Sequence, residues 1–187
     1  MSISMSRRST SVSAISPEFV LLGLLARQPS HGYDLHQRLQ KELGQIWRIS
    51  QSQLYNILKR LESQGDIIAA LQKQPRLPDR YIYHLTEQGK ARFEKWLETP
   101  TGCSVRAIRV EFLSRLYFVY RDHPENVAIL IQIQEDEILE GLERLQRKME
   151  NLPATQIFNR LGLQLRIQQL NSVLGWLKDC AASLDAI

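Results

Sequence analysis

The sequence predicts a mostly helical protein in two parts, and three observations lead to that prediction. Apolar residues recur at helical spacing in nearly every long segment of the 187-residue chain. One pair of β-compatible segments, separated by a turn with two prolines, interrupts the helices of the first half. The segment TPTG at residues 99–102 then separates the two halves. We therefore expect three helices, a two-stranded hairpin and a fourth helix, followed by an entirely helical region.

Composition restricts the class of protein. The chain is 43% apolar and 24% charged, as globular proteins are, and no apolar run approaches the roughly 18 residues of a membrane span. Residues 1–97 hold 14 Lys and Arg against 8 acids, a balance of +6, whereas residues 98–187 have a balance of −2. A basic first half suggests a polyanion-binding unit joined to a part with another task. Cys103 and Cys180 form no metal or redox motif, so a reducing cytoplasm is the expected location.

No catalytic site emerges from the sequence. The four histidines lack metal-ligand spacing, and the nine glycines are scattered at helix ends and turns rather than gathered in a phosphate-binding loop. No nucleophile can be paired with a general base. We therefore expect neither an enzyme nor a bound cofactor or metal.

Residues 1–15 are expected to form a disordered tail. They are rich in serine, contain Arg7 and Arg8, and have neither an acid nor apolar periodicity. A secretory signal is excluded because the segment has no apolar stretch. Its composition also fits an organelle transit peptide, and this alternative stays open, as does contact of the two arginines with phosphates.

The first predicted domain covers residues 16–99 and begins with two helices. Ser16 is expected to cap the first helix, with Pro17 at its first position. The run that follows is apolar nearly all round, which places this helix at the centre of a core. Ser30 is expected to start the second helix, and Gly44 to end it. The apolar stripe of the second helix is Leu35, Leu39 and Leu43.

The third helix, residues 50–64, carries the functional prediction. Ser50 and Gln53 have the spacing of a capping box, and Gly65 is the expected stop. One face is apolar at i, i+3, i+4 and i+7, while the other has short polar groups, cations and no acid before Glu62. Such side chains can contact base edges and phosphates, although an ordinary amphipathic surface helix has the same outline. The candidate DNA contacts here are Gln51, Ser52, Tyr55, Asn56, Lys59 and Arg60.

The hairpin after the third helix is expected to form a wing. Residues 66–72 and 80–86 are β-compatible, and the turn between them carries prolines and cations. Thr86 is expected to cap a fourth helix that returns to the core. Further candidates for contact with DNA are Lys73, Arg76 and Arg80 on the wing. Tyr33 and His31 are candidates from the second helix, with a local capping role equally open for His31.

Three motifs resemble those of the PadR-type transcriptional regulators over roughly residues 17–97. They are HGYDL at residues 31–35, the pair Leu54-Tyr55, and YHLTEQG at residues 83–89. The resemblance implies a winged helix-turn-helix that binds operator DNA as a dimer. Asn56 departs from the family, which usually has proline after the tyrosine, so we expect an altered base preference. The short, proline-bounded wing tip is a second departure.

Residues 104–187 are expected to form a helical dimerisation domain with helices over residues 107–120, 125–152 and 155–184. The long second helix keeps heptad spacing, and the last helix carries two apolar stripes. One stripe can pack on a neighbouring helix of the same chain, whereas the other needs a further surface, which a second copy supplies. A monomeric three-helix bundle is the alternative. The candidate dimerisation residues are Ile138, Leu142, Leu145, Leu163, Ile167, Leu170, Leu174 and Leu177, and the second stripe is Phe158, Leu161 and Leu165.

Some relatives of the resembled family bind planar aromatic effectors in the helical region. The resemblance therefore implies a candidate effector site at Trp96, Tyr117 and Trp176, with a role in the core as the competing interpretation. Together the observations predict a cytoplasmic, homodimeric transcriptional regulator, a repressor rather than an activator. Its operator would be a pseudo-palindrome with half-sites about 10 bp apart or a multiple. A winged-helix module that binds a protein instead of DNA is the alternative, and salt dependence separates the two.

Overall fold

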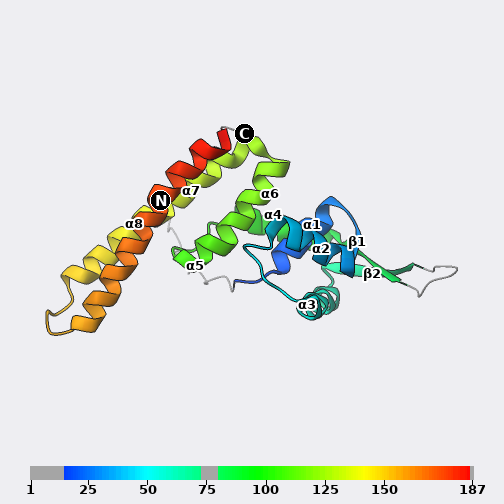
Figure 1. The fold of residues 1–187 in the computed structure, drawn as a ribbon, viewed down its shortest axis with the longest axis horizontal. Coiled ribbons are helices and arrows are strands. Elements are labelled where there is room, and N and C mark those ends of the chain that lie inside the picture. Colours follow the sequence, from blue (N-terminus) through cyan, green and yellow to red (C-terminus); the bar gives the residue numbers. More distant parts are fainter. Residues whose placement is uncertain (1–14, 73–79, 186–187) are drawn as a thin grey trace, which may run out of the picture.

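The computed structural model of the chain describes residues 15–72 and 80–185. Figure 1 shows a unit of short helices with a projecting hairpin, joined to a long helical arm. The elements of the unit are α1 Glu18–Arg27, β1 Ser30–His31, α2 Gly32–Leu43, α3 Gln51–Ser63, β2 Ile67–Gln72, β3 Arg80–Leu85 and α4 Glu87–Glu98. After them come α5 Val105–Ala107, the π-helical turn η1 Ile108–Phe112, α6 Leu113–Asp122, the 3₁₀ turn η2 Pro124–Asn126, α7 Val127–Glu150 and α8 Ile157–Asp185. The predicted fold class, mostly helical with a winged helix-turn-helix first, is confirmed.

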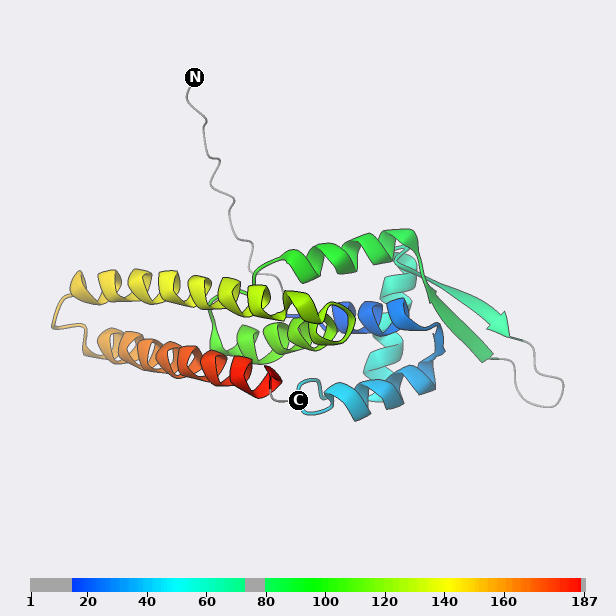
Figure 2. The same cartoon turned by 90° about the horizontal axis from the view of Figure 1, so that it is seen from above.

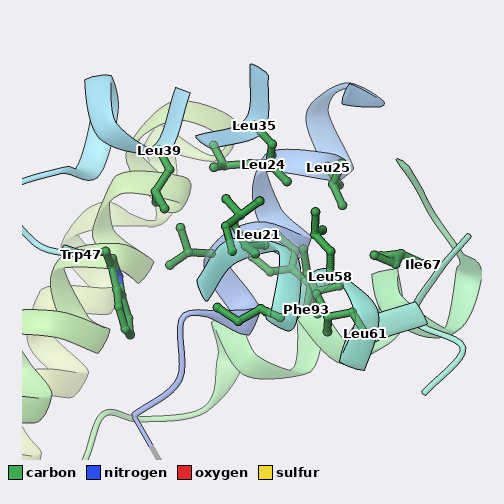
Figure 3. Close-up of a cluster of buried hydrophobic side chains, with 14 of the residues drawn as sticks. Leu21, Leu24, Leu25, Leu35, Leu39, Trp47, Leu58, Leu61, Ile67 and Phe93 are labelled. Carbon is green, nitrogen blue, oxygen red and sulfur yellow. The ribbon is translucent and has the colours of Figure 1, made fainter. Parts of the chain in front are cut away.

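The helices α1, α2, α3 and α4 of the first unit enclose a hydrophobic core, and Figure 3 draws part of it. α1 is buried on nearly every side because its sequence, EFVLLGLLAR, is apolar almost throughout. α2 and α3 each bury one stripe at helical spacing, as their sequences predict. Burying one such leucine contributes roughly 1.5–3 kcal/mol, so α3 is held firmly on its inner side. The buried stripe of α3 is Leu54, Ile57, Leu58 and Leu61.

The hairpin forms as predicted, but it belongs to a sheet of three strands within the described residues. β2 and β3 pair antiparallel along their whole lengths. Ser30 and His31 add a short strand to the other edge of β3, in the order β1-β3-β2. The expectation that Ser30 starts the second helix is therefore wrong, because α2 begins at Gly32. A strand of two residues has no periodicity to detect, and the free edge of β3 that attracts it lies about 50 residues away in sequence.

The ends of the other helices follow their cap residues closely. The predicted start of the first helix is wrong by one residue, because α1 begins at Glu18 and Pro17 rather than Ser16 occupies the N-cap position. The Ser16 hydroxyl nevertheless accepts from the Glu18 N–H at 3.3 Å. Thr86 caps α4 as predicted, because its hydroxyl accepts a hydrogen bond from the Gly89 N–H at 3.1 Å. Gly65 follows α3 with a φ of 79°, a left-handed conformation that glycine adopts without strain.

Residues 105–122 form one helical run that connects the unit to the arm. The run is longer than the predicted helix and contains a π-helical turn, which inserts an extra residue into the turn and changes which side chains face inward. Val110 and Phe118 from this run pack in the first core. Ile108, Phe112 and Leu116 pack in a second core with α7 and α8. The run therefore contributes to both cores, although the segment TPTG at residues 99–102, which separates the two halves in the sequence, comes before it.

α7 and α8 run antiparallel and form the arm, as Figure 2 shows from above. All eight candidate dimerisation residues pack in the second core, between the helices of the one chain. The second stripe of α8 is left on the surface, with Phe158 87% exposed and Leu161 and Leu165 each more than half exposed. Among the described helices, none combines the length and apolarity needed to cross a membrane.

Candidate nucleic-acid interface

The first turn of α3 is fixed by several hydrogen bonds. Ser50 Oγ accepts from the Gln53 N–H at 3.2 Å, and Gln53 Oε1 accepts from the Ser50 N–H at 2.8 Å, which is the predicted capping box. The carbonyl oxygen of Ile49 lies 3.0 Å from His36 Nε2 and accepts from Gln40 Nε2 at 3.2 Å. Both of these residues belong to α2. The start of α3 is thus held from within and from the neighbouring helix.

The outward face of α3 presents polar and cationic side chains. At about 100° per residue, Ser52, Asn56 and Lys59 lie opposite the buried stripe, and all three are exposed. Gln51 is exposed at the first position, whereas the first acid of the helix, Glu62, lies in its last turn. Hydroxyl, amide and ammonium groups on an acid-free surface can contact base edges and phosphates. Four of the six candidates on this helix are therefore exposed and accessible to an external partner.

Tyr55 is half-buried against the start of α2. A methyl group at Gly32 would lie 2.6–2.8 Å from atoms of the Tyr55 ring, so the close approach requires glycine. Gly89 packs in the same manner, since a methyl group there would lie 2.1 Å from the backbone oxygen of Asp66. The three sequence motifs thus mark places where α2 meets α3 and where α4 meets the turn between α3 and β2. Tyr55 serves first to seat α3 on α2.

Arg60 is engaged by the protein itself. Its Nε donates to the buried carboxylate of Glu18, and Arg92 Nη2 donates to the other oxygen of that carboxylate at 2.6 Å. Arg92 also pairs with the buried carboxylate of Asp66, and these ion pairs raise the pKa of Arg92 against the opposing effect of burial. The network ties α1, α3 and α4 together. Arg60 is about half exposed, but its guanidinium is already partly occupied.

The hairpin and α2 hold the remaining candidates. Arg80 is exposed at the start of β3, whereas Lys73 and Arg76 lie outside the described residues. His31 lies in β1 at the N-cap position of α2, but its side chain makes no capping hydrogen bond. Its Nδ1 lies 2.9 Å from the carbonyl oxygen of Tyr81, 50 positions away, and this contact joins β1 to β3. Tyr33 is 55% exposed, and its hydroxyl accepts from Gln37 Nε2 at 3.2 Å.

The three candidate effector residues have different surroundings. Trp96 is buried in the first core and stacks on Phe19 with ring centroids 5.1 Å apart. The hydroxyl of Tyr117 donates to Glu42 at the end of α2. Trp176 lies in α8, 37% exposed, edge-on to Phe112. Each of the three side chains therefore has different partners among the described residues.

The sequence interpretation overlooked groups whose importance depends on tertiary contacts. Glu18 and Arg92 lie 74 positions apart, and no local pattern announces that they meet at α3. Arg48 is exposed in the link just before the cap of α3, where a cation can approach a phosphate. Its charge was visible in the sequence, and its closeness to the predicted helix start was the signal that could have identified it.

Two family matches divide the chain at the place where the unit gives way to the connecting run. Residues 21–95 match the "Transcriptional regulator PadR-like family" and residues 108–185 match "Virulence activator alpha C-term". The negative transcriptional regulator PadR of Bacillus subtilis is 26% identical over 177 residues, covering 90% of this chain and 97% of that protein. A probable transcriptional regulator of Mycobacterium tuberculosis is 29% identical over 84 residues, 45% of this chain and 44% of that protein. These relatives are regulators and not enzymes, in agreement with the sequence-based prediction.

Solved structures show related similarities. The crystal structure of Bacillus subtilis PadR in complex with operator DNA is 27% identical and covers 89% of this chain and 98% of that chain, with a TM-score of 0.43. A crystal structure of a Streptococcus mutans protein is 24% identical and covers 88% of this chain and 98% of that chain, with a TM-score of 0.44.

Proposed function

We propose, on the premise that this chain belongs to the PadR-like family of transcriptional regulators, that it represses transcription by binding operator DNA as a homodimer. The premise rests on the family match over residues 21–95 and on a relative that aligns along nearly its whole length. We assign DNA contact to residues 16–99 and pairing of the two copies to residues 104–187. A repressor of this kind acts where the DNA is, so we expect a cytoplasmic protein.

The exposed, acid-free face of α3 is the observation that carries the proposal. Its side chains belong to a helix whose start, inner stripe and end are all fixed, so they are presented in a defined geometry. We assign Asn56 to bidentate contact with an adenine edge, and Lys59 to guanine or phosphate. Gln51 and Ser52 lie at the N-terminal end, which in helix-turn-helix proteins contacts the bases. We assign contacts with the sugar-phosphate backbone of the DNA to Tyr33, Tyr55, Arg60, Lys73, Arg76 and Arg80.

The exposed stripe of α8 supports pairing of two copies through the arm. Phe158, Leu161 and Leu165 form a contiguous apolar surface at helical spacing, which is costly to leave in water. The eight candidate dimerisation residues form the interior of each arm and would support that surface from behind. A symmetric pair of arms would present two copies of α3 to successive major grooves.

The assignment as a repressor follows the name of the Bacillus subtilis relative, a negative transcriptional regulator. Release by a small planar aromatic effector is a subsidiary part of the proposal. Trp176 is its best-placed residue, because its ring is partly exposed beside the second core. Trp96 and Tyr117 would need to rearrange in order to take part.

The salt dependence of duplex binding tests the proposed function. Neutralised phosphates release counterions, so the logarithm of the binding constant should fall linearly with the logarithm of salt concentration, with a slope of about −0.9 per phosphate contact. A selected operator duplex and a random duplex of equal length should both show steep slopes, with the operator bound more tightly by roughly 10³-fold or more. Absence of duplex binding at low salt would favour the alternative, a winged-helix module that binds a protein.

A further inference from the structure

A hydrogen bond joins the connecting run to the link that leads into α3. Trp47 lies in this link, is buried, and donates its Nε1–H to Ser114 Oγ at 2.8 Å. Ser114 is fully buried and donates its own hydroxyl to the carbonyl oxygen of Val110 at 2.7 Å. Figure 3 shows the indole of Trp47 at the edge of the first core, beside the ribbon of the later helices. The hydrogen bond from Trp47 to Ser114 joins α6 directly to the residues that precede α3.

A second polar contact joins α6 to the end of α2. Tyr117 donates its hydroxyl to the carboxylate of Glu42, and Arg121 Nη1 donates to the same oxygen at 3.1 Å. Burial, and then the Glu42 carboxylate, raise the pKa of Tyr117, so the phenol stays a donor at neutral pH. We call these residues the α6 seam, which consists of Glu42, Trp47, Ser114, Tyr117 and Arg121.

The seam is directional, whereas the apolar contacts around it are not. Phe118 packs edge-on against Phe93, with centroids 5.1 Å apart, and holds α6 on the first core. Apolar burial is roughly proportional to area and tolerates small rotations. Hydrogen bonds weaken with misalignment, and the buried indole N–H of Trp47 loses its partner if α6 turns. The seam therefore selects one orientation of α6 against α2 and α3.

We propose that the α6 seam positions α3 relative to the arm and thereby sets the half-site spacing that the dimer accepts. The inference rests on the proposed function, because spacing has meaning only when two copies bind one duplex. The same helical run packs with α7 and α8 in the second core, so its orientation fixes the placement of the unit on the arm. In a dimer joined through the arms, that orientation determines the separation and rotation of the two α3 helices. One inserted base pair rotates a half-site by roughly 35°, which a rigid seam would resist.

The test measures the affinity of the full-length protein for operators in which the spacing between the half-sites is altered. An operator is selected from random duplexes, and versions are made with one or two base pairs inserted between the half-sites. The seam is loosened by Ser114→Ala with Tyr117→Phe, which removes two hydroxyls and leaves the apolar surfaces. The matched control is Ser183→Ala with Tyr120→Phe. Ser183 donates to the carbonyl four residues earlier, as Ser114 does, but lies exposed near the end of α8, 18 residues beyond Leu165. Tyr120 is half-buried on α6 and is not part of the seam.

Wild-type protein and the control pair should lose about tenfold or more in affinity per inserted base pair. The seam variant should lose no more than about threefold per insertion, while its affinity for the original spacing falls by less than about tenfold. The inference would be overturned if each inserted base pair reduced the affinity of the seam variant by the same factor as that of the wild type, whatever the affinity of the variant for the original spacing. If the double variant shows reduced helix content, Tyr117→Phe alone should shift the spacing penalty in the same direction. Failure of wild-type protein to bind any duplex would instead overturn the proposed function.

Discussion

The winged unit and the arm treat apolar surface in opposite ways. α1, α2 and α3 bury their apolar stripes completely in one core, and α3 turns a polar, cationic face outward. α8 buries one stripe against α7 but leaves Phe158, Leu161 and Leu165 on the surface. The difference indicates that the unit, together with Val110 and Phe118 of the connecting run, buries its own apolar stripes and offers charge and hydrogen bonds to a partner. The arm offers apolar area, which another apolar surface would cover.

The two helices of the arm also differ from each other in charge. α8 contains no acid from Ile157 to Lys178, whereas α7 carries acids along its exposed sides. Several of those acids are paired within α7, such as Glu140 with Arg144 four residues later. Such exposed pairs contribute only about 0.3–0.5 kcal/mol each. The arm is therefore held mainly by its apolar interior.

The largest expected effect comes from placing a charge in the exposed stripe of the arm. Leu161→Asp should convert a dimer into a species of 21.7 kDa, the mass of one chain, as measured by light scattering. Loss of the second binding unit should weaken operator binding by about 10²-fold or more. Gln164→Asp, an exposed polar position one turn away on the same helix, adds the same charge and should leave the dimer intact. Wild-type protein that scatters as a single chain at micromolar concentration would remove the claim of pairing.

Next in size is the effect of a cavity in the core of the unit. Leu58→Ala removes a fully buried side chain from α3 and should reduce the free energy of unfolding by about 2–5 kcal/mol. Leu71→Ala makes the same chemical change at a 49% exposed position on the hairpin, and should cost less than about 1 kcal/mol. Chemical denaturation of the two variants side by side gives both values. Similar costs at the two sites would show that α3 is not anchored through its buried stripe.

A smaller effect is expected from removing one exposed cation. Lys59→Ala should weaken binding to any duplex several-fold and reduce the magnitude of the salt slope by about 1. Lys178→Ala removes the same charge from an exposed position of the arm and should leave both quantities unchanged. Equal losses in the two variants would mean that overall charge, and not the α3 face, attracts the DNA.

The smallest effect concerns the interior of the arm. Burial raises the pKa of both Cys103 and Cys180 above its ordinary value, so each has less reactive thiolate at a given pH. At pH 8 both should therefore react with a thiol reagent more slowly in the folded protein than in urea. Equal rates in the two conditions would mean that the second core is loosely packed, despite the helical interior described for it.

Prediction from the sequence succeeded where short-range patterns decide the structure. The capping box of Ser50 and Gln53, the cap at Thr86, the hairpin and the buried stripes all depend on residues within a few positions of one another. The exposure of Asn56 and Lys59 follows from the same helical periodicity.

Features that depend on distant residues could not be read from the sequence. β1 exists because the edge of β3 is available, and Arg60 is engaged because Glu18 of another helix reaches it. The bond from Trp47 to Ser114 crosses 67 positions, and the π-helical turn that precedes Ser114 has no sequence signature. The candidate effector residues were grouped because they are aromatic. In the structure Trp96 packs on Phe19 in the first core, whereas Trp176 packs on Phe112 of the second core.

The most direct test of whether the outward face of α3 recognises DNA sequence compares wild-type protein with Asn56→Ala. The affinity of each is measured for the selected operator and for a random duplex. If Asn56 contacts a base edge, Asn56→Ala should lose about 1–3 kcal/mol of binding free energy on the operator, relax preference at one base position, and keep its affinity for the random duplex. Its salt slope should match that of the wild type, because no phosphate contact is removed. Equal losses on both duplexes, or no loss on either, would mean that the outward face of α3 does not recognise DNA sequence.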